Sequence, residues 1–450
     1  MTMKIKIGLR LQSIALMAGL LTGFHAANAE DGASTNFEID ARLKSNLPAL
    51  ETLYRDLHSH PELGLQEKRT AALLAARMRS LGLDVTENVG GTGVVAIFRN
   101  GPGPVVMVRT EMDALPVEEK TGVPYASRVR APYEGMPRYV SHMCGHDLHM
   151  TWWVGTATLL SALKDRWKGT LVFIAQPAEE AGTGAAAMLK DGLFTRFPKP
   201  QFAFAAHVVP GPAGTISVKD GTVTSADDSI RIVFKGRGGH GSMPSETIDP
   251  IVMGARFVTD VQSVVSRQKR PGAFGVISVG MFRAGEAENI IPDEAELKLT
   301  VRSFDSDVRK TLVGGIERTA RATAEMAMAP PPVIDRFEAA DSVINDHALF
   351  EKTARFLQTH NKADTIVVVP ASEPGWSASE DYYAFIQAGV PSVYMTIGAF
   401  SPATIKSYSE KGVPLPTNHS PLFAPDPQLT IPTGIRALSL SVLAVLGESK

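Results

Sequence analysis

The densest group of chemically reactive side chains lies in residues 141–149, which read Ser-His-Met-Cys-Gly-His-Asp-Leu-His. Cysteine thiolates and histidine imidazoles suit zinc and its first-row neighbours as ligands. Gly145 lets the backbone bend, so that the side chains of Cys144 and His146 can face one point. We therefore predict a metal site here, against the alternative of a polar loop at a helix start with Asp147 near the cap.

An acidic pair, Glu179 and Glu180, follows an apolar run at residues 170–175 that is typical of a strand. Ligands commonly bind beyond the strand ends of open α/β sheets, and past a strand end both carboxylates can turn toward one centre. One carboxylate would bind metal while the other accepts a proton from water. Without the other motifs, an acidic pair is more often a solvated loop.

Two further histidines complete the candidate ligand set. His207 follows an apolar, strand-like run at residues 202–206, and His419 lies in the proline-bounded loop Thr-Asn-His-Ser-Pro. An isolated histidine is more often structural than a ligand. Strand ends and loops are, however, where sites are usually built.

The elements that must position these residues alternate between extended and helical patterns. Apolar spacing predicts helices at residues 43–58, 67–81 and 151–163, and strands at 93–98, 105–108, 170–175 and 202–207. Near the end of the chain it predicts a helix at 346–359, strands at 365–369 and 392–397, and a helix at 429–446. This alternation predicts an α/β sandwich around a mainly parallel, mixed sheet.

The segment at residues 228–339 has a different rhythm. It predicts strand 229–235, helix 250–267, strands 274–282 and 295–304, helix 307–327 and strand 332–337. This β-α-β-β-α-β order is the ferredoxin-like, split βαβ arrangement. We predict an inserted domain at residues 226–337 and a discontinuous catalytic domain at residues 30–225 and 338–450.

The first 29 residues have the pattern of a secretory signal peptide. Lys4, Lys6 and Arg10 precede an apolar run at residues 11–24, and the small-residue triplet at 27–29 predicts cleavage after Ala29. A transmembrane anchor needs about 20 continuous apolar residues, and this run is shorter. We find no later segment that is long and apolar enough to span a bilayer. The predicted location is a periplasm or the outside of the cell.

The charge balance excludes some partners. The sequence has 45 Lys and Arg against 47 Asp and Glu, a net charge of −2, and its mean hydropathy is +0.01. No basic surface for nucleic acid or for an anionic membrane is expected, so the predicted partner is a small molecule. Cys144 is the single cysteine and cannot form an intrachain disulfide.

These residues belong to an ordered series of motifs that spans the chain beyond the predicted signal peptide. The motifs are Asp113–Pro116, Cys144–Asp147, Gln176–Glu180, Ala206–His207, Gly238–Pro244, Asn289–Pro292, Ser379–Asp381 and Asn418–Pro421. The series resembles the aminoacylase and carboxypeptidase-type metallopeptidase family. More narrowly, it is similar to the hippurate hydrolases and auxin-conjugate amidohydrolases.

The resemblance implies a centre of two divalent metal ions, zinc or manganese, cobalt or nickel. The implied ligands are Cys144, His146, Glu180, His207 and His419, with the thiolate shared between the metals. Glu179 matches the general base, which returns its proton to the leaving amine. The implied reaction hydrolyses the amide bond of an N-acyl amino acid or a related small amide.

The resemblance also assigns roles outside the ligand set. His240 matches a histidine that reaches the active site of a partner subunit and stabilises the oxyanion, so the inserted domain would be a lid and dimerisation domain of a homodimer. The alternative is that His240 only belongs to a glycine-rich loop. Asn289 is a candidate substrate contact. Arg302 is a candidate partner of a substrate carboxylate, although an arginine on a strand is more often exposed.

One position departs from the resemblance. The subfamily usually has an aspartate two residues before the residue that matches Asp113, and this chain has Glu111. In the wider family that position holds a metal-binding histidine, so Glu111 either perturbs the site or forms a hydrogen bond nearby. Asp113 and Glu380 are expected to support the site, with a charge at a helix start as the other role for Glu380.

Two alternatives remain open. A dipeptidase or carboxypeptidase of the same family would use the same chemistry with a different pocket. A non-catalytic binding protein would keep the fold without the chemistry, but Glu179 and every implied ligand are present. A serine hydrolase has no support, because the sequence lacks a Gly-x-Ser-x-Gly elbow.

Overall fold

The computed structural model describes the backbone of residues 18–447 and the side chains of residues 38–447 except Glu338. Most of the predicted signal peptide lies outside the described residues. The described part of it belongs to the first helix, α1 (Ala18–Ser59), so the predicted cleavage point after Ala29 falls within α1. The predicted helix at residues 43–58 is the C-terminal part of α1.

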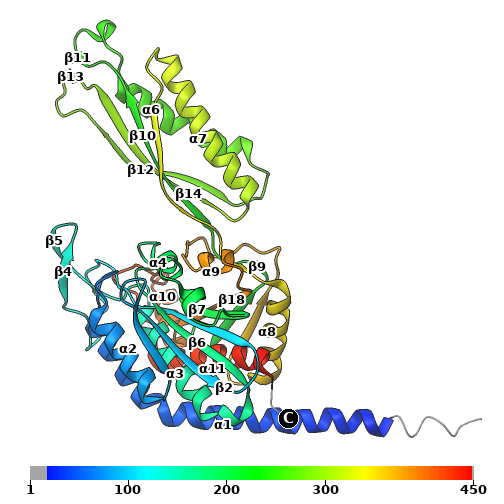
Figure 1. Ribbon diagram of the computed structural model, residues 1–450. Coiled ribbons are helices and arrows are strands. Elements are labelled where there is room, and N and C mark those ends of the chain that lie inside the picture. The colour runs from blue at the N-terminus through cyan, green and yellow to red at the C-terminus, as the bar shows by residue number, and fades with distance from the viewer. Residues whose placement is uncertain (1–17, 448–450) are drawn as a thin grey trace, which may run out of the picture.

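A mixed eight-stranded sheet, in the order β1-β2-β6-β3-β7-β18-β8-β17, forms the larger layer (Figure 1). Its strands are β1 (Asp84–Val89), β2 (Gly93–Asn100), β3 (Val105–Glu111), β6 (Gly169–Gln176), β7 (Phe202–Pro212), β8 (Thr215–Lys219), β17 (Thr365–Val369) and β18 (Ser392–Phe400). Neighbouring strands from β6 to β18 run parallel, whereas β1, β2 and β6 pair antiparallel, as do β18 and β8. The predicted mixed, mainly parallel α/β sheet is confirmed.

Helices cover both faces of this sheet because its central strands are apolar on both sides. In β6, Leu171 and Phe173 face the core that packs against α1, α2 (Lys68–Ser80), α3 (His146–Ala162), α8 (His347–His360) and α11 (Pro427–Leu446). The intervening Val172 and Ile174 face a second core, which α4 (Gly184–Lys190), α5 (Leu193–Arg196) and α9 (Tyr383–Gln387) cover.

Close helix packing beneath the sheet depends on two glycines. A Cβ at Gly155 of α3 would lie 2.2 Å from Ile435 of α11, and a Cβ at Gly434 of α11 would lie 2.3 Å from the Trp152 ring of α3. Glycine therefore allows α3 and α11 to approach at both points. This contact fixes α3, whose first residue is the candidate ligand His146.

The prediction that no segment after the N-terminal apolar run could span a bilayer was wrong for α11. This helix is long and apolar enough by length and composition, with a mean hydropathy of 1.7. In the structure, however, 89% of its apolar window is buried, as in the core helix of a globular protein.

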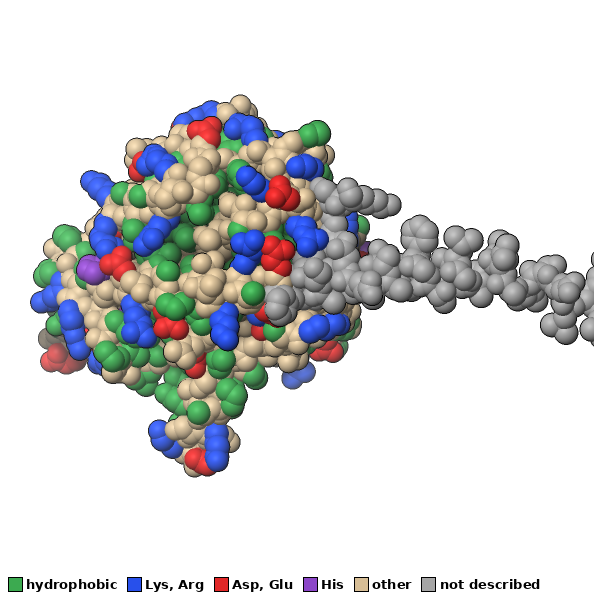
Figure 2. All heavy atoms as spheres, turned by 90° about the horizontal axis from the view of Figure 1, so that it is seen from below, with side chains coloured by type: hydrophobic (Ala, Val, Ile, Leu, Met, Phe, Trp, Pro, Cys, Tyr) green, Lys and Arg blue, Asp and Glu red, His purple; other side chains and the backbone are tan. Residues whose placement is uncertain are grey.

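On the face shown in Figure 2, Lys and Arg side chains are interspersed with Asp and Glu.

A second, four-stranded antiparallel sheet lies apart from the first in Figure 1. Its elements follow the order β10 (Ala226–Lys235), α6 (Pro250–Asp260), β12 (Gly275–Ala284), β14 (Glu294–Ser303), α7 (Ser306–Met326) and β15 (Val333–Ala340). The sheet order β12-β14-β10-β15 is that of a ferredoxin-like fold. The helix predicted at 250–267 is too long. In the structure α6 ends at Asp260, and a π-helical turn follows at Val264–Gln268.

Shorter elements complete the chain. They are β4 (Arg130–Tyr133), β5 (Met136–Tyr139), the 3-10 turns at Lys164–Arg166 and Pro244–Glu246, β9 (Gly221–Thr222), β11 (Gly239–His240), β13 (Ile290–Ile291), β16 (Ile344–Asn345) and α10 (Pro402–Glu410). Strands β4 and β5 form an exposed hairpin directly before residues 141–149.

Candidate metal centre

The turn before α3 brings Cys144 and His146 together. Gly145 has a φ of 88°, a left-handed conformation that favours glycine, and a Cβ there would lie 2.4 Å from Val208 Cγ1. The predicted bend is therefore present, and both side chains are buried. The candidate metal-binding segment includes the start of α3, since His146 is the first residue of that helix.

A second turn directs both carboxylates of the acidic pair to the same place. Ala178 has a φ of 47°, and its N–H donates to Glu67 Oε1 at 2.9 Å. The backbone N–H of Glu180 donates to Asp113 Oδ2 at 2.9 Å. Asp113 thus positions the acidic turn, which agrees with the supporting role expected for it.

The five predicted ligands and Glu179 converge beyond β6. Donor atoms within 4.8 Å of one another form one group of Cys144, Glu180 and His419, and another of His146, Glu179 and Glu180. His207 joins them because its Nε2 lies 3.4 Å from Cys144 Sγ. The prediction placed His207 at a strand end, but β7 continues to Pro212 and His207 lies within it.

Hydrogen bonds orient two of the histidines as ligands. His146 Nδ1 donates to the Asp113 carbonyl at 2.9 Å, which leaves the Nε2 lone pair facing Glu179 and Glu180 at 3.7 and 3.8 Å. His207 Nδ1 donates to the Val208 carbonyl at 2.8 Å, which leaves its Nε2 facing Cys144. This pattern, with one ring nitrogen held by a carbonyl, is typical of metal-binding histidines.

The electrostatics of the cluster fit a cation. Burial raises the pKa of the Cys144 thiol well above its ordinary value, and Glu180 and Glu179 raise it further. Burial, Glu380 and Glu180 likewise raise the pKa of Glu179. Burial opposes a charge on His146, yet the hydrogen bond to Asp113 and the charge of Glu111 raise its pKa to about 10. A positive charge is thus favoured among these groups.

Buried polar atoms without hydrogen-bond partners also indicate that the cluster fits a cation. His146 Nε2, Glu180 Oε1 and Asp113 Oδ1 are buried and have no hydrogen-bond partner among the described residues. Buried polar atoms without partners are costly, and a divalent cation would satisfy lone pairs of this kind. The donor set of thiolate, imidazole and carboxylate therefore fits divalent metal ions.

The loop that carries His419 connects the ligand segments. His419 has a strained φ of 67°, and its Nε2 lies 3.4 Å from Glu180 Oε2. The neighbouring Asn418 side chain donates to the carbonyls of Cys144 and Val208, at 3.1 and 3.0 Å. Asn418 thus links the segments that carry Cys144, His207 and His419.

A buried arginine next to the centre was missed in the sequence. Arg109 Nη2 lies 2.7 Å from Glu380 Oε1 and 3.2 Å from Asp381 Oδ1, and Arg109 Nη1 lies 2.5 Å from Glu111 Oε1. Glu380 also accepts from the Tyr394 hydroxyl at 2.6 Å. Glu380 is therefore buried and ion-paired beside the cluster, and it also accepts from the Tyr382 N–H just before α9.

His149 was part of the dense segment but was not assigned a role. The Val208 N–H donates to His149 Nε2 at 2.9 Å, and His149 Nδ1 lies 3.2 Å from Glu111 Oε2. Both ring nitrogens are occupied, so His149 does not offer a free lone pair, although it lies in a group with Glu111, His146 and His207. Glu111 forms a hydrogen bond beside the ligands, one of the two outcomes considered for it.

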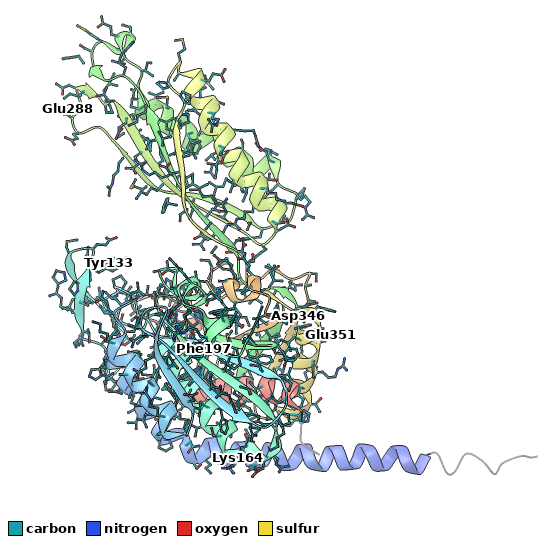
Figure 3. All side chains as sticks on the ribbon, in the orientation of Figure 1. Tyr133, Lys164, Phe197, Glu288, Asp346 and Glu351 are labelled. Atoms are coloured by element: carbon teal, nitrogen blue, oxygen red, sulfur yellow. The ribbon has the colours of Figure 1, made fainter. Side chains whose placement is uncertain are left out.

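The structure does not bring the three remaining candidates to the centre of their own chain. His240 on β11 and Asn289 lie at the far end of the inserted segment, near Glu288 in Figure 3. There the Gly241 N–H donates to the Asn289 carbonyl at 2.8 Å. Arg302 of β14 pairs with Asp227 at 3.3 Å. None of the three has a hydrogen bond or ion pair to a candidate ligand within the described part of the chain.

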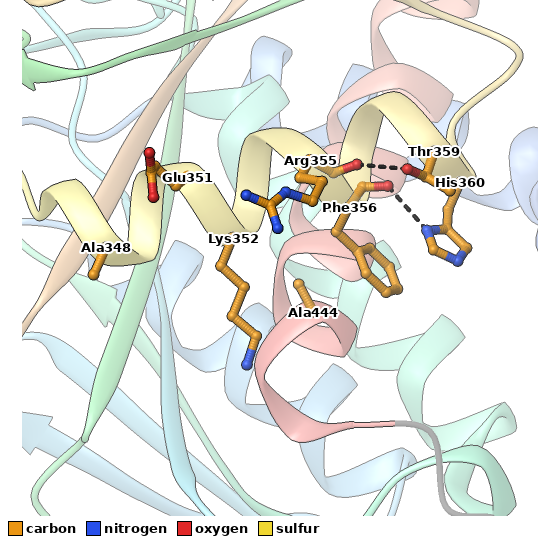
Figure 4. Close-up of a pocket in the computed structure, with 8 residues that line it drawn as sticks. All are labelled: Ala348, Glu351, Lys352, Arg355, Phe356, Thr359, His360 and Ala444. Carbon is orange, nitrogen blue, oxygen red and sulfur yellow. Dashed lines mark hydrogen bonds between the residues drawn. The ribbon is translucent and has the colours of Figure 1, made fainter. Parts of the chain in front are cut away.

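A surface pocket of about 360 Å³ lies elsewhere, between α8 and the end of α11 (Figure 4). Its lining residues are Ala348, Glu351, Lys352, Arg355, Phe356, Thr359, His360 and Ala444. It contains none of the candidate ligands, so the candidate metal centre is the buried cluster beyond β6.

The mixed sheet and the buried cluster of candidate ligands fit the class of metal-dependent peptidases. The chain belongs to Peptidase family M20/M25/M40, whose family model matches residues 107–412. The predicted family is confirmed, and the narrower subfamily stays a prediction. An enzyme that acts on amide bonds was predicted, and membership of this family confirms it.

Individual relatives have several activities. Thermostable carboxypeptidase 2 of Saccharolobus solfataricus is 32% identical over 418 residues, 91% of this chain and 99% of the relative. Hippurate hydrolase of Campylobacter jejuni is 38% identical over 277 residues, 61% of this chain and 70% of the relative. A solved dinuclear metal binding peptidase of the M20 family from Bacillus subtilis has a TM-score of 0.71 and 28% identity, covering 89% of this chain and 99% of that one.

Proposed function

We propose that the protein is a metal-dependent amidohydrolase that cleaves N-acyl amino acids or related small amides, with Glu179 as its general base. One observation carries this proposal. The Glu179 carboxylate is only 10% exposed and lies among the candidate ligands, yet it accepts no hydrogen bond from any residue that the structure describes. Its lone pairs are therefore free to take a proton from an attacking water.

The residues present fit the proposed cofactor. Cys144, His146, Glu180, His207 and His419 would hold two divalent ions, zinc or manganese, cobalt or nickel, which supply Lewis acidity at the substrate carbonyl and at the attacking water. Glu179 accepts the proton of that water and then donates it to the leaving nitrogen. The raised pKa of Glu179 suits a group that must hold this proton, and a nearby cation would lower that pKa toward the working range.

His240 would complete the site from a second subunit. Its Nδ1 accepts from the Ser242 N–H at 3.1 Å, so a neutral ring carries its proton on Nε2. The side chain is exposed, and β11, which carries it, lies far from the candidate metal ligands of its own chain (Figure 1). A donor of this kind can stabilise the developing oxyanion in a partner, which makes the proposed active form a homodimer.

The proposed substrate class rests on the relatives. Those named for acylated amino acids include hippurate hydrolase, N-acetylcysteine deacetylase and an N-acyl-L-amino acid amidohydrolase. Within the family, we propose that the chain groups with the hippurate hydrolases and auxin-conjugate amidohydrolases. A carboxypeptidase is the second candidate, because the thermostable carboxypeptidase relative aligns over nearly the whole chain. The N-terminal pattern supports export to a periplasm or to the medium.

The test is hydrolysis of N-acetyl, N-benzoyl and long-chain N-acyl amino acids beside simple dipeptides. Chelator-treated protein should be inactive and should recover with zinc or manganese. Glu179→Ala should lower kcat by at least 100-fold, whereas Glu351→Ala, at an exposed position on α8, should not. Preference for dipeptides would favour the peptidase, and metal binding without any turnover would contradict an enzyme.

A further inference from the structure

An aromatic side chain lies directly against one of the candidate ligands. The ring centroids of Trp376 and His207 are 4.9 Å apart, with an angle of 57° between the ring planes. His207 is 3% exposed, whereas Trp376 is only partly buried. The indole therefore forms part of an open surface next to the cluster of candidate metal ligands.

Trp376 differs from the other three tryptophans of the chain. Trp152, Trp153 and Trp167 are each 0% exposed and belong to the main core. The indole N–H groups of Trp153 and Trp167 donate to backbone carbonyls, whereas those of the fully buried Trp152 and the partly exposed Trp376 have no hydrogen-bond partner among the described residues. Trp376 is thus not a core residue, and its polar edge is free for a ligand or water.

Backbone hydrogen bonds fix the segment that carries this indole. The Trp376 N–H donates to the Val223 carbonyl at 2.7 Å, and the Ser225 N–H donates to the Trp376 carbonyl at 3.1 Å. A Cβ at Gly375 would lie 2.4 Å from the carbonyl oxygen of Val223, which lies between β9 and β10, so the two segments approach too closely for any side chain at Gly375. The segment that carries the ring is thus pre-organised, which lowers the conformational cost of binding a ligand there.

We propose that Trp376 is the wall of a subsite that binds a planar aromatic acyl group of the substrate, a proposal that rests on the proposed amidohydrolase function. Aromatic rings favour stacked or edge-on contacts with one another. The amine half of an N-acyl amino acid carries a carboxylate, which needs a cation or hydrogen-bond donors rather than an indole face. The acyl half is therefore the half that fits Trp376.

The test compares N-benzoylglycine with N-acetylglycine, which share the same amine half. We expect the wild-type enzyme to prefer the benzoyl substrate, and Trp376→Ala to lower the ratio of the two kcat/KM values about tenfold. Trp376→Phe keeps an aromatic wall and should retain most of the ratio. Tyr133→Ala removes an exposed aromatic at the tip of the β4–β5 hairpin and should leave the ratio unchanged.

A binding measurement separates this subsite from the proposed reaction. Benzoate should quench the tryptophan fluorescence of wild-type protein, because the partly open tryptophan is the one it reaches, and it should not quench Trp376→Phe. Quenching in a protein that cleaves neither amide would keep the subsite and reject the amidohydrolase. Cleavage of both amides with a ratio insensitive to Trp376→Ala, or benzoate quenching that persists in Trp376→Phe, would reject the subsite.

Discussion

The Glu111 carboxylate accepts a hydrogen bond from His149 Nδ1 at 3.2 Å, while its other oxygen lies 2.5 Å from Arg109. His149 in turn packs against His207, with ring centroids 4.5 Å apart. Glu111, the position that departs from the pattern of the resemblance, therefore pairs with a buried arginine and with a histidine that packs against the candidate ligand His207. Burial alone would raise the pKa of Glu111, but Arg109 and His149 lower it well below its ordinary value.

Removal of this carboxylate should destabilise the fold. Glu111→Ala leaves the His149 N–H unpaired and takes one partner from the buried Arg109, so we expect a loss of about 3 kcal/mol in the free energy of unfolding. Glu111→Asp keeps the charge and should lose less. Urea unfolding measures both, with Glu118→Ala at an exposed neighbouring position as the control. Equal stability of Glu111→Ala and the wild type would contradict this account.

The convergence of several candidate ligands could be predicted because their sequence signals are local. Cys144 and His146 lie in one short segment, and Glu179 and Glu180 are adjacent after a strand. The role of His149 could not be predicted, because it depends on an N–H of Val208, 59 residues away. Arg109 was missed for the same reason, since its carboxylate partner Glu380 is 271 residues away and the two meet only across the folded sheet.

Asn418 should control metal affinity without touching the metal. Its amide ties the carbonyls of Cys144 and Val208 together, so Asn418→Ala frees the segments that carry three candidate ligands. We expect zinc affinity to fall about 10- to 100-fold, as for other supporting partners of metal ligands. Competition with a chromogenic chelator measures this, with Gln358→Ala on α8 as the control. An unchanged zinc affinity would show that the segments carrying the candidate ligands keep their positions without the Asn418 hydrogen bonds.

The buried His58 makes stability depend on pH. Burial disfavours its charge, but hydrogen bonds to Asp147 at 2.6 Å and Glu119 at 3.0 Å raise its pKa from 6.5 to about 9. The folded state therefore binds this proton more tightly than the unfolded state. The resulting stability, about 3 kcal/mol, is fully present below pH 6.5 and is lost as the pH rises through 9.

Urea unfolding at pH 6.5 and pH 9.5 tests this dependence. The wild type should be less stable at the higher pH, and His58→Asn should have a smaller difference between the two values because it has no proton to lose. His60→Asn is a suitable control, since His60 is 51% exposed and pairs only at the surface. A wild-type stability that rises over this range would contradict the assignment.

The fold was predictable where apolar spacing is strong and less so where contacts decide the end of an element. The run at residues 365–369 was predicted with the bounds of β17. The helix predicted to reach residue 267 instead gives way to a π-helical turn beyond Asp260, although the apolar spacing continues. The edge strand β1 has mostly polar residues, so its pairing with β2 could not be inferred from hydropathy.

The position of His240 leads to a prediction about pairs of subunits. If His240 serves the partner, Glu179→Ala and His240→Ala homodimers should each be nearly inactive. A heterodimer of the two would contain one intact site, formed by Glu179 of the His240→Ala subunit and His240 of the Glu179→Ala subunit. Random exchange should then restore roughly a quarter of wild-type activity, because half of the dimers are mixed and each has one working site of two. A mixture that stays inactive after subunit exchange, confirmed by mass spectrometry of tagged chains, would instead place His240 in the site of its own chain, which would require the inserted domain to close over the metal cluster.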